Sequence, residues 1–196
     1  MTTRVQENQG LQQLSLKRPM LCALEKAMLC QLAFNKTDKV LDANVCSGRV
    51  AEYLLEHTEC LVCGVSDRME EVRQVRARLF GGDFAYAAIG DIPWPENTFD
   101  VVLLHPAEGG MEALQEQLRE CRRVLKQGGR LILGLKCLPT VIRHIGSFLW
   151  ESSEEGLPDA QAAQQAMESI GFEAVVSTQA GFSGHVLTGH LLHKDE

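Results

Sequence analysis

The chain has 196 residues, of which 45% are hydrophobic and 23% are charged, and its formal net charge is −7. This length and composition predict a single globular domain over residues 1–196, with an N-terminal lead and helix (1–35) and a core (36–196). The acidic balance argues against a nucleic-acid partner, because proteins that bind the phosphate backbone usually present a basic face.

Targeting and membrane signals do not stand out in the sequence. The N-terminal segment MTTRVQENQG is polar, unlike a signal peptide, and no apolar run approaches the roughly 20 residues of a membrane span. We therefore expect a cytoplasmic protein with no membrane partner, whose seven cysteines are reduced. Cys60 and Cys63 have C-x-x-C spacing, but they lie in an apolar run without a second ligand pair. Packed strand cysteines and no metal site are the interpretation we favour.

Helices and strands are predicted to alternate along the chain. After a polar lead, Pro19 begins a helix that extends to about residue 33. Helical apolar spacing recurs over residues 50–55, 72–79, 114–125 and 163–170, and the third of these helices is expected to end at Gly128 and Gly129. Short apolar runs predict seven strands, at residues 39–43, 60–65, 84–89, 100–105, 130–135, 172–178 and 186–193.

This order predicts an α/β fold with a doubly wound, mostly parallel seven-stranded sheet. Strands without polar alternation are buried on both faces, and their alternation with helices implies parallel pairing through right-handed crossovers. The last two strands are separated by only the short segment QAGFSGH, which is too short for a helical crossover. They are therefore expected to pair antiparallel.

Polar residues follow the first four predicted strands, at the edge where ligands bind in a doubly wound sheet. They are the segment from Asp42 to Gly48, Ser66 with Asp67, Gly90 with Asp91, and His105. A carboxylate after the second strand is well placed to accept hydrogen bonds from a ribose diol. A turn that binds nothing is the alternative reading of the first segment.

Three segments between Lys39 and Leu135 resemble motifs of the class I S-adenosylmethionine-dependent methyltransferases, which have a Rossmann-like fold. VLDANVCSGRVAEYLL resembles their motif I, with the form V-L-D-x-G-x-G-x-G. GDIPWPENTFDVVLLH resembles the motifs around their third and fourth strands. RECRRVLKQGGRLIL resembles the segment R-E-x-x-R-V-L-K-P-G-G-x-L.

The resemblance implies S-adenosylmethionine as cofactor and assigns roles by position. Asp42 corresponds to the acid near the methionine ammonium, and the loop through Gly48 would pass beneath the amino-acid portion. Asn44 and Cys46 stand in that loop where the family has glycines, which allow positive φ and close approach to the ligand.

The adenosine half of the cofactor is assigned in the same way. Asp91 corresponds to the acid that contacts the adenine amine, with the backbone of Ile92 beside the ring. Ser66 occupies the position of the ribose-binding acid, and Asp67 follows one residue later. A one-residue shift along a strand turns a side chain to the other face.

His105 is the candidate general base, because it follows the fourth strand and its unperturbed pKa of about 6.5 suits proton transfer. A histidine that only caps the strand is the alternative. The segment HPAEGG differs from the N/D-P-P-Y motif of nucleic-acid amino methyltransferases, which argues against methylation of bases.

The leading hypothesis is methyl transfer to a small-molecule substrate, and the alternative is a catalytically inactive, methyltransferase-like binding or scaffold protein. The predicted helix at 19–33 and the segment at 137–156 are expected to cover the site, with Phe148 and Trp150 lining an acceptor pocket or packing on the sheet. A homodimer is a candidate assembly.

Overall fold

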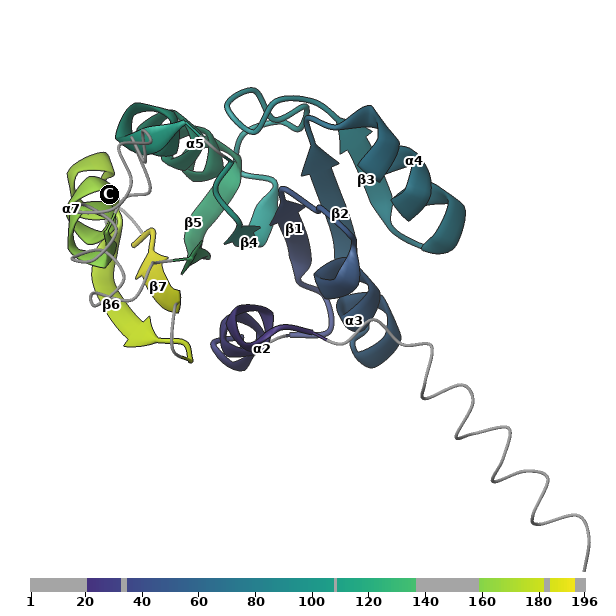
Figure 1. Ribbon diagram of the computed structural model, residues 1–196, viewed down its shortest axis with the longest axis horizontal. Coiled ribbons are helices and arrows are strands. Elements are labelled where there is room, and N and C mark those ends of the chain that lie inside the picture. Colours follow the sequence, from purple (N-terminus) through teal and green to yellow (C-terminus); the bar gives the residue numbers. More distant parts are fainter. Residues whose placement is uncertain (1–20, 33–34, 108, 137–158, 182–183, 193–196) are drawn as a thin grey trace, which may run out of the picture.

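A seven-stranded sheet lies at the centre of the computed structural model, which describes residues 21–32, 35–107, 109–136, 159–181 and 184–192. Its strands are β1 (Lys39–Ala43), β2 (Leu61–Ser66), β3 (Asp83–Tyr86), β4 (Phe99–Leu104), β5 (Leu125–Lys136), β6 (Glu173–Gln179) and β7 (Gly184–His190). The helices are α2 (Ala23–Cys30), α3 (Arg49–His57), α4 (Met69–Arg78), α5 (Gly110–Val124) and α7 (Ala160–Ile170). The strand order is β3-β2-β1-β4-β5-β7-β6 (Figure 1).

The pairing confirms the predicted topology. β1 pairs parallel with β2 and β4, β2 with β3, and β4 with β5. β7 is antiparallel to both of its neighbours, β5 and β6. The short connection between β6 and β7 therefore makes a hairpin, as its length requires.

Each face of the sheet buries one hydrophobic cluster. Leu41 of β1 belongs to the cluster under α5 and α7, whereas the adjacent Val40 belongs to the cluster under α2, α3 and α4. Burial on both sides explains why the strands are continuous apolar runs. Cys60 and Cys63 are buried free thiols on opposite faces, which confirms them as packed cysteines.

The boundary between α5 and β5 differs from the prediction. The helix ends at Val124 rather than at the two glycines, because the carbonyl oxygens of Arg123 and Val124 accept the backbone amides of Asn97 and Thr98. β5 begins at Leu125, and its register with β4 shifts before Arg130. Gly128, at φ +77°, lies in this bulge and donates its amide to the carbonyl of Leu191, at 2.6 Å.

The N-terminal helix is shorter than predicted and starts at the carboxyl edge of the sheet. Cys22 caps it, with a reciprocal hydrogen-bond pair to Glu25, whereas Pro19 lies outside the described residues. A Cβ placed on Gly184 would lie 3.3 Å from Cδ1 of Leu24, and Gly184 pairs with the last residue of β5. The first turn of α2 therefore lies beside the strand ends that form the candidate site.

Some predicted features fall outside the described residues. They include the covering segment at 137–156 with Phe148 and Trp150. None of the helices in the described part of the chain is long and apolar enough to cross a membrane.

Candidate functional site

The candidate site lies where the carboxyl ends of β1, β2 and β4 meet. β1 and β4 are neighbours, although β2 and β3 come between them in the sequence, so the chain changes winding direction at this point. His105 donates its backbone amide to the carbonyl of Ala43 at 3.1 Å, which joins the segments that leave β4 and β1. Switch points of this kind are the usual ligand sites of open α/β sheets.

The loop after β1 turns sharply, and both non-glycine residues at the family's glycine positions adopt left-handed backbone conformations. Asn44 has φ +74° and Cys46 has φ +45°. The backbone amides of Asn44 and Val45 both donate to the carbonyl of Val65, at 2.9 Å each. The Asn44 side chain donates from Nδ2 to the carbonyl of His105 at 3.0 Å. The loop thus follows the backbone path expected for glycines, although two of its three glycine positions hold Asn44 and Cys46.

Gly48 is the residue in this loop that must be glycine. Its φ is +73°, and a Cβ there would lie 2.9 Å from Cγ2 of Val75 on α4. The lack of space excludes a side chain here, and the left-handed backbone, which Asn44 tolerates, would add strain for most other residues. Gly48 also caps the N-terminus of α3, so the chain enters this helix directly from the loop.

Asp42 is buried at the end of β1, with 1% of its surface exposed. Its Oδ2 has no hydrogen-bond partner within the described residues. The pKa of Asp42 is raised to about 7, first by burial and then by the negative charge of Glu25, against a hydrogen bond from the backbone of Ala51. A buried carboxyl oxygen without a donor is a costly feature. It fits a ligand that brings a cationic donor to this point.

At the end of β2, the structure brings an acid to the site that sequence reasoning missed. Ser66 is fully buried, and its Oγ donates to Oε2 of Glu71 on α4 at 2.8 Å. The Glu71 carboxylate also raises the pKa of Cys46, second only to burial, and so acts across the site toward the β1 loop. Asp67 is exposed. A carboxylate five residues after the strand end, in the first turn of a helix, was the available signal.

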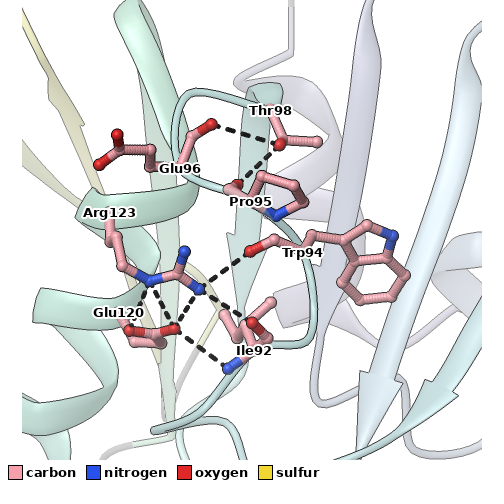
Figure 2. A network of polar contacts seen from close by, with 7 residues as sticks. All are labelled: Ile92, Trp94, Pro95, Glu96, Thr98, Glu120 and Arg123. Carbon is pink, nitrogen blue, oxygen red and sulfur yellow. Dashed lines mark hydrogen bonds and ion pairs between the residues drawn. The ribbon is translucent and has the colours of Figure 1, made fainter.

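The loop after β3 contains Asp91 and Ile92 and is held against α5 (Figure 2). Oε1 of Glu120 accepts the backbone amide of Ile92 at 3.1 Å. Nη2 of Arg123 donates to the carbonyls of Ile92 and Trp94, at 2.9 and 3.0 Å. Since both the amide and the carbonyl of Ile92 are hydrogen-bonded within the protein, this residue can contact a ligand only through van der Waals packing. Asp91 is exposed at the start of this loop.

His105 is half-buried beyond β4, and its imidazole is neutral at physiological pH. Burial lowers its pKa to about 4, and the positive charges of Lys136 and Arg49 act in the same direction, against Glu25. The neutral imidazole has an unprotonated nitrogen that can accept a proton, but its low pKa makes it a weaker base than the unperturbed histidine that the sequence suggested. The backbone of His105 also bonds to Ala43 and Asn44, so a structural role in holding the strand end exists beside any catalytic one.

The described residues contain no group of three or more His, Cys, Asp or Glu side chains that could hold a metal ion. The predicted site residues after β1, β2 and β4 do come together at one edge of the sheet. Among the described residues of that edge, Glu25 and Glu71 are the acids that the sequence did not single out.

Most of the sequence from β1 to β5 matches a known domain. Residues 41–133 match the family model described as a methyltransferase domain. The chain is 30% identical over 146 residues to 27-O-demethylrifamycin SV methyltransferase of Amycolatopsis mediterranei, covering 71% of this chain and 49% of that protein. It is 33% identical over 105 residues to demethylmenaquinone methyltransferase of Thermotoga maritima, covering 52% and 44%. The chain spans about half the length of these relatives.

Solved structures share the fold at low sequence identity. The YcgJ protein of Bacillus subtilis superposes with a TM-score of 0.70 at 14% identity, covering 87% of this chain and 99% of that one. Geranyl diphosphate methyltransferase in complex with S-adenosylmethionine superposes with a TM-score of 0.66 at 16% identity, covering 87% and 85%. The matched domain and the methyltransferase relatives place the chain in the class I S-adenosylmethionine-dependent methyltransferase superfamily, and the solved structures share its fold.

Proposed function

We propose that this protein binds S-adenosylmethionine at the carboxyl ends of β1, β2 and β4 and transfers its methyl group to a small molecule. The observation that supports this most is the buried Asp42, whose Oδ2 has no partner within the described residues. The ammonium of the cofactor is a donor of the right charge for this oxygen. The left-handed conformations of Asn44 and Cys46 also keep the backbone of this loop close to Asp42, where the amino-acid portion of the cofactor would lie.

The adenosine half would extend from β2 toward the loop after β3. We assign the ribose diol to Glu71, supported by Ser66, rather than to the exposed Asp67. Asp91 would accept the adenine amine, and Ile92 would pack beside the ring. Arg123 and Glu120 of α5 would keep this loop in place.

When bound, the cofactor supplies a methyl group on a positively charged sulfur, which makes the carbon electrophilic. The protein then needs to position the acceptor in line and, for a hydroxyl acceptor, to take up its proton. His105 is the group proposed for that step, because it lies half-buried at the end of β4, beside Ala43 and Asn44 of the candidate site.

A small-molecule acceptor is supported by what the relatives are named for. The two relatives compared above are named for a demethylrifamycin and a demethylmenaquinone. We therefore propose small molecules with a free hydroxyl, and quinones, as the first acceptors to test. The free thiols among the described cysteines agree with a reducing, cytoplasmic setting, which we propose as well. A homodimer stays a prediction, to be tested by sedimentation.

Calorimetry with S-adenosylhomocysteine, the demethylated cofactor, is the direct test. We expect measurable heat, together with a rise in melting temperature that grows with ligand concentration. No heat and no thermal shift at millimolar ligand would contradict the proposal.

That second outcome would favour the alternative, a methyltransferase-like binding or scaffold protein without catalysis. Cys46 is the observation behind this alternative, because it places a side chain where the family has none. If that side chain keeps the cofactor out of the site, the protein would act through binding to another molecule rather than through methyl transfer.

A further inference from the structure

Glu25 is a buried acid that comes to the site from outside the matched segment, on α2. It is only 8% exposed. Its Oε2 accepts the backbone amide of Cys22 at 2.6 Å, and its Oε1 accepts Nη2 and Nε of Arg49 at 2.8 and 3.0 Å. Arg49 is the first residue of α3, directly after the β1 loop. The ion pair thus ties the start of α2 to the start of the helix that follows the candidate ligand loop.

Burial, and then the negative charge of Glu25, make Asp42 the titrating group of this cluster near neutral pH. Burial raises the pKa of Glu25, but the bonds from Arg49 and Cys22 outweigh it and the net shift is downward, so Glu25 is ionised. Its partner Arg49 stays charged, because the hydrogen bond with Glu25 raises the pKa of the guanidinium. The pKa values of His105, at about 4, and Cys46, at about 11, leave both neutral. Of these five groups, Asp42 alone changes charge between pH 6 and pH 8.

Within the described residues, the other titratable groups that act on this cluster are the Cys22 thiol beside Glu25 and the Lys136 ammonium at the end of β5, together with Glu71 and Arg68 near the Cys46 thiol. Among these charges, the negative charge of Glu25 raises the pKa of both Asp42 and His105. Both acids bond to the first turn of α3, Asp42 through the backbone of Ala51 and Glu25 through the side chain of Arg49. The Asp42 oxygen without a partner is therefore close enough to Glu25 for the two negative charges to repel each other.

We propose that Glu25, held by Arg49, is a positioning residue that couples binding of a cationic ligand group at Asp42 to release of a proton from that carboxyl. The protonated Asp42 meets the ligand ammonium, its O–H bond breaks, the proton leaves to solvent, and the carboxylate accepts the ammonium N–H. No other bond forms or breaks. The inference rests on the proposed function for the identity of the ligand, but not for the coupling between Glu25 and Asp42.

The first experiment measures the coupling without any ligand. Carbon NMR of the Asp42 carboxyl should show a titration midpoint near pH 7 in the unmodified protein. In Glu25→Gln, which removes the charge and keeps the shape, the midpoint should fall by about one pH unit. Glu56→Gln makes the same change at an exposed position of α3 and should leave the midpoint where it is.

The second experiment measures the linkage with S-adenosylhomocysteine as the probe. Calorimetry in buffers of different ionisation enthalpy should show release of about half a proton per ligand at pH 7, and affinity should rise about tenfold from pH 6 to pH 8. In Glu25→Gln the same rise should shrink to about twofold. Asp42→Asn should bind weakly with no pH dependence over this range, and Glu56→Gln should behave as the unmodified protein.

The outcomes separate this inference from the proposed function. A Glu25→Gln protein that is less stable but keeps the unmodified pH profile would show a purely structural role and overturn the inference. An Asp42 midpoint near that of a free carboxyl would overturn it as well, even if Glu25→Gln does not fold. A normal NMR result with no binding at any pH would refute the proposed function and the ligand half of the inference, leaving the Glu25–Asp42 coupling established.

Discussion

At the scale of single residues, Cys46 offers the sharpest test of the β1 loop. A non-glycine residue in the left-handed region costs about 1 kcal/mol, and Cys46 lies there at φ +45°. Cys46→Gly should therefore stabilise the fold by roughly 0.5–1 kcal/mol, despite the greater freedom of glycine in the unfolded chain. Removing the thiol should also tighten binding of S-adenosylhomocysteine by about two- to fivefold. Thermal melting and calorimetry measure the two effects.

Asn44 is the matched comparison, because it shares with Cys46 the left-handed conformation and the hydrogen bond from Cys46 Sγ to Asn44 Oδ1, at 3.4 Å, and makes one further contact. Its Nδ2 donates to the carbonyl of His105 at 3.0 Å, a bond that Asn44→Gly would lose. The gain from relieved backbone strain should be offset, leaving stability within about 0.5 kcal/mol of the original. Equal stabilisation by both substitutions would show that the Asn44 bond contributes nothing.

Glu71 should distinguish ligands by their ribose hydroxyls. The unmodified protein should bind S-adenosylhomocysteine about tenfold more tightly than its 2′-deoxy analogue, since a charge-assisted hydrogen bond contributes about 1.5–3 kcal/mol. Glu71→Gln should reduce that preference to about twofold or less, measured by calorimetry with both ligands. Asp67→Asn, one residue beyond the end of β2, should preserve it. Loss of the preference in Asp67→Asn instead would move the ribose contact to that residue.

At the scale of elements, α5 fixes the loop that would hold the adenine. Arg123→Ala removes the donors to the Ile92 and Trp94 carbonyls and the pair with Glu120 (Figure 2). We expect a loss of about 1–3 kcal/mol in stability, faster hydrogen exchange over residues 91–98, and weaker binding of S-adenosylhomocysteine. Arg119→Ala, exposed on the same helix, is the control. Unchanged exchange in Arg123→Ala would show that the loop is held by packing alone.

The sequence predicted the elements whose bounds depend on neighbouring residues, and it misplaced those whose bounds depend on contacts with distant segments. β1 was predicted to the residue, because KVLDA is a local apolar run bounded by polar residues. The end of α5 was misplaced because it depends on Asn97 and Thr98. These two residues lie in a loop more than twenty positions earlier in the sequence, and their backbone amides donate to the last carbonyls of the helix. β3 was predicted to extend to residue 89, yet it ends at Tyr86, where the chain turns toward the site.

The candidate site divides in the same way. The segments at Asp42–Gly48, Ser66, Asp91 and His105 follow strands, so the strand pattern was enough to find them. Glu71 and Glu25 lie on helices, and only the packing of α4 and α2 against the sheet turns them toward the strand ends. Periodicity reports which face of a helix is apolar, but not which polar residue beside that face reaches a distant strand.

At the scale of the whole molecule, the buried Asp42 should reduce stability above neutral pH. Its folded pKa of about 7 exceeds the unfolded value, so the folded state binds more protons and stability falls as pH rises toward 7. His105 has the opposite effect below pH 6.5, because its folded pKa of about 4 disfavours the charged form. The two slopes oppose each other between about pH 4 and 6.5, and the Asp42 cost remains in full above 7.

Asp42→Asn should therefore raise stability at pH 8 by about 1–3 kcal/mol, a discounted figure for a shift of this size, while it weakens cofactor binding. At pH 5 the folded carboxyl is neutral but the unfolded one is mostly ionised, so only part of the cost is present, and the same substitution should raise stability by about 0.5–1 kcal/mol. Denaturant unfolding at the two pH values measures this difference. Asp67→Asn should show no such difference between the two pH values. An Asp42→Asn protein that is equally destabilised at pH 5 and pH 8 would contradict the assignment of the charge cost to Asp42.

The position of β7 has a consequence for how the chain folds as it is synthesised. β7 is made after β5 and β6, yet it lies between them. Until residue 190 has left the ribosome, the long edge of β5 has no partner, and β6 has no neighbour to pair with. An apolar strand with an open edge can pair with other chains. A ribosome that pauses before β7 is complete should therefore leave a nascent chain that depends on chaperones, and slow synthesis there should lower the yield of folded protein more than slow synthesis before β5.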